Sequence, residues 1–205
     1  MVTTPQSIAD ALDMLAERDP DIARTLAEVG YPEPRVRTPG FATLLDIIVG
    51  QQVSTQSAAA IRGRLHAAAD PMTPDSFLSL DDAALRGIGF SRRKIEYGRL
   101  LAQDIADGRF DPDGLPALDD DAVLEQIVAR KGLGRWSAEI YMLFAMGRAD
   151  VWPADDLAVQ VAVQRLKGLE ERPDRATMDA VAEPWRPYRG VAALLMWHVY
   201  RKAAL

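Results

Sequence analysis

Apolar residues recur at helical spacing along almost the whole chain of 205 residues. Alternating strand-like runs are scarce, and no Asn-Gly or Asp-Gly hairpin dipeptide separates two of them. We therefore predict an all-α fold. The predicted helices cover residues 7–18, 21–29, 41–49, 54–69, 74–79, 81–86, 91–107, 119–130, 135–146, 155–167, 174–183 and 188–203.

The helical pattern has one long interruption near the N-terminus. Three prolines predict an extended linker there: Pro32, Pro34 and Pro39. Residues 41–49, which follow the linker, are almost wholly apolar and predict a buried helix. Ser54 is a candidate N-cap for the next helix.

The composition limits the class of protein. With 48% hydrophobic residues, a chain of this length can bury a sizeable core, as one domain or two small lobes. No apolar stretch reaches the length of a membrane span, and the N-terminus lacks a basic-then-apolar signal pattern. We expect a cytoplasmic protein that does not bind membranes.

The chain has no cysteine, which excludes disulfides, thiolate nucleophiles and iron–sulfur clusters. His66 and His198 are the only imidazoles, and most of the chain separates them. A zinc site is therefore not expected.

The formal net charge of −6 argues against a protein that coats nucleic acid without specificity. The basic residues are nevertheless clustered, while residues 111–125 are acidic. This distribution is compatible with a DNA site of few phosphate contacts, although solvated helix faces would give the same pattern. The clusters comprise Arg86, Arg92, Arg93, Lys94 and Arg99, and then Arg130, Lys131 and Arg135.

A glycine turn in the second basic cluster predicts a backbone site for anions. Gly132 and Gly134 flank Leu133 and allow a sharp turn before an apolar helix that Ser137 opens. The first N–H groups of such a helix favour a phosphate. Glycines near residue 88 predict a similar turn. Neither of the two glycine turns continues into a dinucleotide or P-loop fingerprint.

These motifs resemble those of the helix-hairpin-helix (HhH-GPD) DNA glycosylase superfamily, and most of all its 3-methyladenine DNA glycosylase II (AlkA-like) subgroup. Residues 132–138 resemble the hairpin, and residues 153–157 resemble the segment with the acid that follows it. Residues 44–54, 85–94 and 185–197 extend the similarity in the expected order.

The resemblance implies a two-lobed helical glycosylase fold without the N-terminal β domain of larger relatives. Residues 1–205 would form a single compact unit of two lobes, with the hairpin at about 119–147. The N-terminal helices, within residues 6–30, would pack with the C-terminal helices.

The resemblance implies that Asp155 is the catalytic acid. Its carboxylate would stabilise the positive charge that develops on the sugar as the base leaves, and could orient the attacking water. The alternative is that Asp155 only caps the next helix. Asp156 is expected to be a first-turn acid, favoured by the helix dipole.

Two tryptophans are candidates for the substrate-base pocket. Trp197 matches the family's stacking tryptophan, with a core residue as the alternative, and Trp136 is the second candidate. Trp136 also stands where strand-cleaving relatives carry a lysine nucleophile, so no lyase activity is expected. Trp152 and Trp185 are expected to be packing residues.

The remaining site residues would hold DNA. Gln52 matches the wedge that fills the gap left by a flipped nucleotide, although a surface cap on the preceding helix would explain it equally well. The expected DNA-binding residues are Gln51, Gln52, Ser54, Arg92, Arg93, Lys94, Lys131, Gly132, Gly134, Arg135 and Ser137. A structural Na or K ion at the hairpin would bind the backbone carbonyls of Val128, Arg130 and Leu133.

The implied function is that of a monofunctional DNA glycosylase in base excision repair, which needs no cofactor. It would act as a monomer on damaged double-stranded DNA, flip the nucleotide out and hydrolyse the N-glycosidic bond of 3-methyladenine or 7-methylguanine. Two alternatives stay open: a non-catalytic helix-hairpin-helix DNA-binding module, and a glycosylase for hypoxanthine, uracil or 1-methyladenine.

Overall fold

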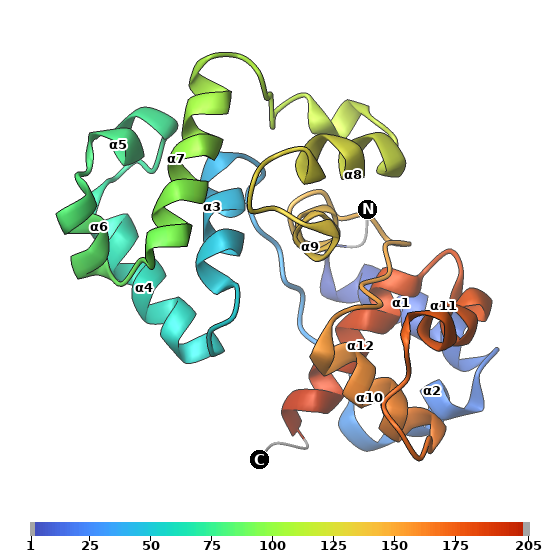
Figure 1. Cartoon of the computed structure of the whole chain (residues 1–205). Coiled ribbons are helices and arrows are strands. Elements are labelled where there is room, and N and C mark those ends of the chain that lie inside the picture. The colour runs from blue at the N-terminus through green and yellow to red at the C-terminus, as the bar shows by residue number, and fades with distance from the viewer. Residues whose placement is uncertain (1–2, 203–205) are drawn as a thin grey trace. The chain divides into compact units, whose positions relative to one another are not determined.

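The computed structural model describes residues 3–202, which fold into helices joined by short loops (Figure 1). Within this range there is no β-strand, so the prediction of an all-α fold is confirmed. The α-helices are α1 (Pro5–Ala16), α2 (Pro20–Val29), α3 (Phe41–Gly50), α4 (Thr55–Ala68), α5 (Pro74–Ser79), α6 (Asp82–Ile88), α7 (Arg92–Ala106), α8 (Asp120–Val128), α9 (Arg135–Phe144), α10 (Leu157–Lys167), α11 (Arg175–Ala182) and α12 (Arg189–Lys202).

Each helix coincides with a predicted range to within a few residues at its ends. The first helix begins earlier than predicted, because Pro5 occupies its first turn and Thr4 caps it. Ser7, the predicted start, instead completes a capping box with Thr4. Two short 3-10 helices were not predicted: η1 (Leu115–Ala117) and η2 (Glu183–Trp185).

The chain divides into two compact units. Residues 37–141 form one unit, and the segments before and after them form the other. Each unit therefore has a core of its own, and the boundary falls inside the sequence of α9.

The core of the unit made by residues 37–141 is built on α3, which packs against α4 and α7 (Figure 1). Six apolar side chains of α3 are buried, as expected for an almost wholly apolar helix: Phe41, Leu44, Leu45, Ile47, Ile48 and Val49. Phe77 of α5 lies between two further rings, with centroid distances of 5.9 Å to Phe41 and 6.0 Å to Phe90. The contact with Phe41 packs α5 against the N-terminal end of α3.

The core of the other unit is built on α12, whose residues from Gly190 to Trp197 are all buried. α12 packs against α10 and against the N-terminal helices α1 and α2. A partly buried ionic contact adds to this packing, because Lys167 Nζ donates to Asp19 at 2.7 Å. The N-terminal helices are thus part of the same core as the C-terminal helices.

None of the helices in the range that the structure describes is long and apolar enough to cross a membrane.

Candidate functional site

The glycine turn forms a compact hairpin between α8 and α9. The N–H of Leu133 donates to the carbonyl of Arg130 at 3.0 Å, and the Leu133 side chain is buried. Gly132 has φ +91°, a conformation that side chains disfavour. The chain therefore reverses direction directly before the N-terminus of α9.

Gly132 is also required for space. A Cβ atom at this position would lie 2.3 Å from the ring of Tyr97, which belongs to α7. A Cβ atom at Gly134 would meet nothing within 4 Å apart from its own chain neighbours. Of the two predicted hairpin glycines, only Gly132 is thus constrained by the residues around it.

Gln51 holds the hairpin from the end of α3. Its Nε2 donates to the carbonyl of Gly132 at 2.8 Å and to Ser137 Oγ at 3.2 Å. Ser137 is almost fully buried. Both residues are expected to bind DNA; in the structure their side chains tie the glutamine turn to the hairpin.

Gln52 stands at the exposed tip of the glutamine turn. Its φ of +56° is unusual for a residue other than glycine. The C-cap position of α3 belongs to Gln51, so Gln52 does not cap that helix. Ser54 caps α4 as predicted, with its side chain accepting from the N–H of Ser57 at 3.1 Å.

The basic residues at the start of α7 differ in their surroundings. Arg92 and Arg93 are exposed. Lys94 is partly buried, and its Nζ donates to the carbonyl of Val49 at the end of α3, at 2.7 Å. Burial lowers the pKa of the Lys94 ammonium. Arg92 and Arg93 are therefore the more accessible candidates for a phosphate contact.

Two basic side chains of the hairpin form ion pairs. Lys131 Nζ lies 2.5 Å from Glu96, and this hydrogen bond raises the pKa of the lysine. Arg135 lies 3.7 Å from Glu139 within α9, and half of its side chain is exposed. The Lys131–Glu96 pair is exposed and contributes little to stability, so a DNA phosphate can replace Glu96, whereas the Glu139 carboxylate is buried.

The adjacent acids after Pro153 have different environments. Asp156 is the N-cap of α10, since its Oδ1 accepts from the N–H of Val159 at 3.0 Å. The expectation that Asp156 is a first-turn acid was wrong, because α10 begins two residues later than predicted. The Asp155 carboxylate is about half exposed and forms an ion pair with Arg175 of α11.

The turn that carries Asp155 is fixed on both sides. Trp152 Nε1 donates to the carbonyl of Met178 at 3.2 Å, and Gln160 donates to the carbonyl of Ala154 at 2.9 Å. Trp152 also packs edge-on against Trp185, with a centroid distance of 5.5 Å, and both rings are buried. Their predicted packing role is confirmed. The Asp155 backbone is therefore held by its neighbours on either side.

Trp197 lies close to the second acid. Its Nε1 donates to Asp156 Oδ1 at 3.0 Å, and only 7% of the residue is exposed. Phe144 packs against the ring at 5.4 Å between centroids, and the Arg35 guanidinium lies 5.6 Å from the ring centroid. Phe144 and Arg35 were not predicted as site residues. Arg35 lies in the proline-rich linker, where no periodic pattern marks a contact.

Trp136 is placed in the first turn of α9 and is partly exposed. It lies in the unit of residues 37–141, whereas Trp197 lies in the other unit. The roles of both tryptophans in a base pocket stay predictions. Neither unit contains a cluster of acidic or histidine side chains suited to a metal ion, within the residues that the structure describes.

Comparison with known families identifies the arrangement. A profile of the HhH-GPD superfamily, described as base excision DNA repair proteins, matches residues 45–187. The chain belongs to the HhH-GPD superfamily. The matched range contains the glutamine turn, both glycine turns and the acid pair after Pro153.

Several members of the superfamily are similar to this chain over much of its length. DNA-3-methyladenine glycosylase 1 of Schizosaccharomyces pombe is 28% identical over 80% of this chain and 73% of its own. A putative DNA-3-methyladenine glycosylase of Bacillus subtilis is 31% identical over 60% of this chain. The alignment spans only 43% of the Bacillus subtilis protein.

Solved structures of superfamily members have the same fold. The 3-methyladenine DNA glycosylase of Schizosaccharomyces pombe, in complex with abasic DNA, superimposes with a TM-score of 0.87 and 26% identity, covering 96% of this chain and 97% of its own. A DNA-3-methyladenine glycosidase of Bacillus halodurans gives 0.77 and 31% identity, covering 95% and 90%.

Proposed function

We propose that the protein is a monofunctional DNA glycosylase of base excision repair that removes alkylated purines such as 3-methyladenine and 7-methylguanine. The observation that carries the proposal is the half-exposed Asp155 carboxylate, which lies on a fixed turn and leaves the helix cap to Asp156. The glycosylase relatives, named for 3-methyladenine, support the choice of substrate.

Asp155 would supply the main chemical contribution. As the N-glycosidic bond breaks, positive charge develops on the sugar, and a fixed carboxylate near C1′ lowers the energy of that state. The same carboxylate can orient the water that attacks the sugar. Flipping the nucleotide out of the duplex must come first, because a stacked base hides this bond.

Trp197 and Phe144 would recognise the flipped base. Their ring centroids lie 5.4 Å apart, and both rings are electron-rich. A purine that carries a methyl group at N3 or N7 is cationic, so a cation–π contact favours it over an undamaged base. Such a base also departs readily, without a strong general acid.

The unit of residues 37–141 would hold the damaged double-stranded DNA as part of a monomer. The N-terminus of α9 favours a phosphate, and Arg92 and Arg93 offer exposed charges. Gln52, at the tip of its turn, would fill the gap left by the flipped nucleotide.

Trp136 supports hydrolysis without strand cleavage. A lyase needs an amine that forms a Schiff base with the sugar, and an indole cannot do so. The proposed reaction therefore ends with an intact strand that contains an abasic site.

A monovalent cation at the hairpin is compatible with the backbone. The carbonyl of Arg130 accepts one hydrogen bond from the N–H of Leu133, which leaves its second lone pair for an ion. Together with the carbonyls of Val128 and Leu133, it would hold Na or K beside a DNA phosphate.

The proposal is tested by replacing Asp155 while its ion-pair partner is kept. We expect Asp155→Asn to lose at least about a hundredfold in the rate of base release from methylated DNA, because a neutral amide cannot stabilise the cationic sugar. DNA binding, measured by fluorescence anisotropy, should stay intact or become tighter.

Asp179→Asn is the matched control. Asp179 is also half exposed and lies 3.8 Å from the same arginine, Arg175. This variant should release bases at nearly the wild-type rate. Base release by Asp155→Asn at the wild-type rate would refute the assignment and favour a non-catalytic DNA-binding module.

A further inference from the structure

Arg35 places a positive charge on the two rings that the proposed function assigns to the flipped base. The Arg35 guanidinium carbon lies 5.6 Å from the Trp197 centroid and 5.9 Å from the Phe144 centroid. Both distances fall in the range of a cation–π contact. One cation thus lies against both aromatic rings in the protein without DNA.

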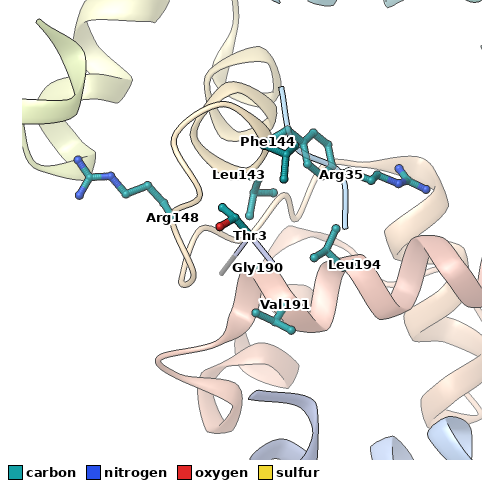
Figure 2. Close-up of a pocket in the computed structure, with 9 residues that line it drawn as sticks. Thr3, Arg35, Leu143, Phe144, Arg148, Gly190, Val191 and Leu194 are labelled. Atoms are coloured by element: carbon teal, nitrogen blue, oxygen red, sulfur yellow. The ribbon is translucent and has the colours of Figure 1, made fainter. Parts of the chain in front are cut away.

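The cavity beside the Phe144 ring is too small for a base as it stands. Leu143 and Phe144, at the end of α9, line one side, and Val191 and Leu194 of α12 line another (Figure 2). Figure 2 shows Arg35 extending beside the Phe144 ring at the edge of the cavity. Its volume of about 20 Å³ admits a water molecule but not a purine.

The backbone around Arg35 permits the side chain to leave. Arg35 belongs to the extended segment between α2 and α3, which contains no helical hydrogen bonds. Pro34 precedes it, and Val36, which follows, is 60% exposed. Moving the Arg35 side chain therefore breaks no helix and removes the cation from both rings.

We propose that Arg35 is a resident cation that occupies the base-binding surface of Trp197 and Phe144 until a flipped base displaces it. This inference rests on the proposed function for the location of the base. Arg35 would thus lower the affinity of the two rings for every base, since each base must first compensate for the lost guanidinium contact.

Once Arg35 is displaced, the two rings bind a cationic base more tightly than a neutral one. A cationic base restores a cation–π contact with the same rings, whereas a neutral base offers only stacking. The free-energy cost of moving Arg35 is equal for cationic and neutral bases. Neutral, undamaged bases bind the rings more weakly, so they are the first to stop occupying them. The ligand class of this surface is therefore a planar aromatic cation.

The test measures binding of two small probes to the whole protein, without DNA. The probes are 1-methylquinolinium, a planar cation, and quinoline, its neutral counterpart at pH 7.5. Dissociation constants come from NMR titration of the tryptophan indole resonances. Arg35→Met removes the charge with a side chain of similar length, and Arg35→Lys keeps the charge.

We expect both probes to bind Arg35→Met about three- to tenfold more tightly than the wild type, the factor expected for one lost competing contact. Arg35→Lys should resemble the wild type. Phe144→Leu should weaken binding of the cation more than that of quinoline. Unchanged or weaker binding of both probes to Arg35→Met would overturn the proposal.

Two further measurements keep the outcome unambiguous. Circular dichroism checks that Arg35→Met is folded, and Arg35→Gln replaces it if it is not. Base release from methylated DNA is assayed separately. Tighter probe binding without any base release by the wild type would leave the cation surface standing and defeat the proposed function, whereas base release with unchanged probe binding would defeat the role of Arg35 alone.

Discussion

At the scale of single residues, two adjacent carboxylates have separate tasks. Asp156 is buried and accepts hydrogen bonds from Val159 and Trp197, whereas Asp155 is half exposed and pairs with Arg175. The sequence located the acid pair but could not assign the cap. That assignment depends on where α10 begins and on Trp197, which is distant in the chain.

This division predicts that two alanine substitutions change stability by different amounts. Asp156→Ala should lower the free energy of unfolding by about 2–4 kcal/mol, because it removes a helix cap and leaves the buried Trp197 N–H without its acceptor. Asp155→Ala should change it by less than about 1 kcal/mol, since its ion pair is exposed. Urea denaturation measures both, and a larger loss for Asp155→Ala would contradict the assignment.

At the scale of elements, the hairpin depends on contacts from α3 and α7. The pattern of glycines predicted the turn, and hydrophobic periodicity predicted both flanking helices. Periodicity carries no information on contacts between distant segments. The hydrogen bond from Gln51 to Gly132 and the contact of Gly132 with Tyr97 therefore emerged only from the structure.

These contacts predict that the two hairpin glycines tolerate substitution differently. Gly132→Ala should cost about 2–4 kcal/mol of stability, because alanine is strained at this φ and its Cβ would overlap the Tyr97 ring. It should also weaken DNA binding. Gly134→Ala, with open space around its Cβ, is the matched control and should stay close to the wild type. Equal effects in thermal unfolding and DNA binding would show that the Tyr97 contact does not matter.

At the scale of the whole molecule, the N-terminal helices complete a core with the C-terminal ones. Asp19, at the start of α2, accepts from Lys167 at 2.7 Å and from Trp185 Nε1 at 2.8 Å. The helices themselves follow from periodicity. Their partners across the chain do not, and the partly buried ionic contact between Lys167 and Asp19 has no local sequence signal.

The contacts of Asp19 make the stability of the protein depend on pH. Burial raises the pKa of Asp19, but the hydrogen bonds from Lys167 and Trp185 outweigh it, so the pKa lies below its ordinary value of 3.8. The Asp19 carboxyl therefore binds a proton more readily in the unfolded state than in the folded state. The stabilisation that Asp19 contributes is present above about pH 4 and is lost as the pH falls below that value.

Asp19→Asn should therefore lower the free energy of unfolding by about 1–3 kcal/mol at pH 7. The difference from the wild type should shrink as the pH is lowered below about 4, where the wild-type carboxylate is also protonated. Urea denaturation over this pH range checks the prediction. A difference that stays constant down to about pH 2 would mean that the Asp19 charge does not stabilise the fold.

The central claim is that this member of the HhH-GPD superfamily removes alkylated purines and leaves the strand whole. The most direct measurement incubates methylated double-stranded DNA with the wild-type protein, identifies released bases by mass spectrometry and examines strand length on a denaturing gel. We predict release of 3-methyladenine and 7-methylguanine, with nicks only after heat or alkali. Absence of these bases, or nicking by the protein alone, would contradict the claim.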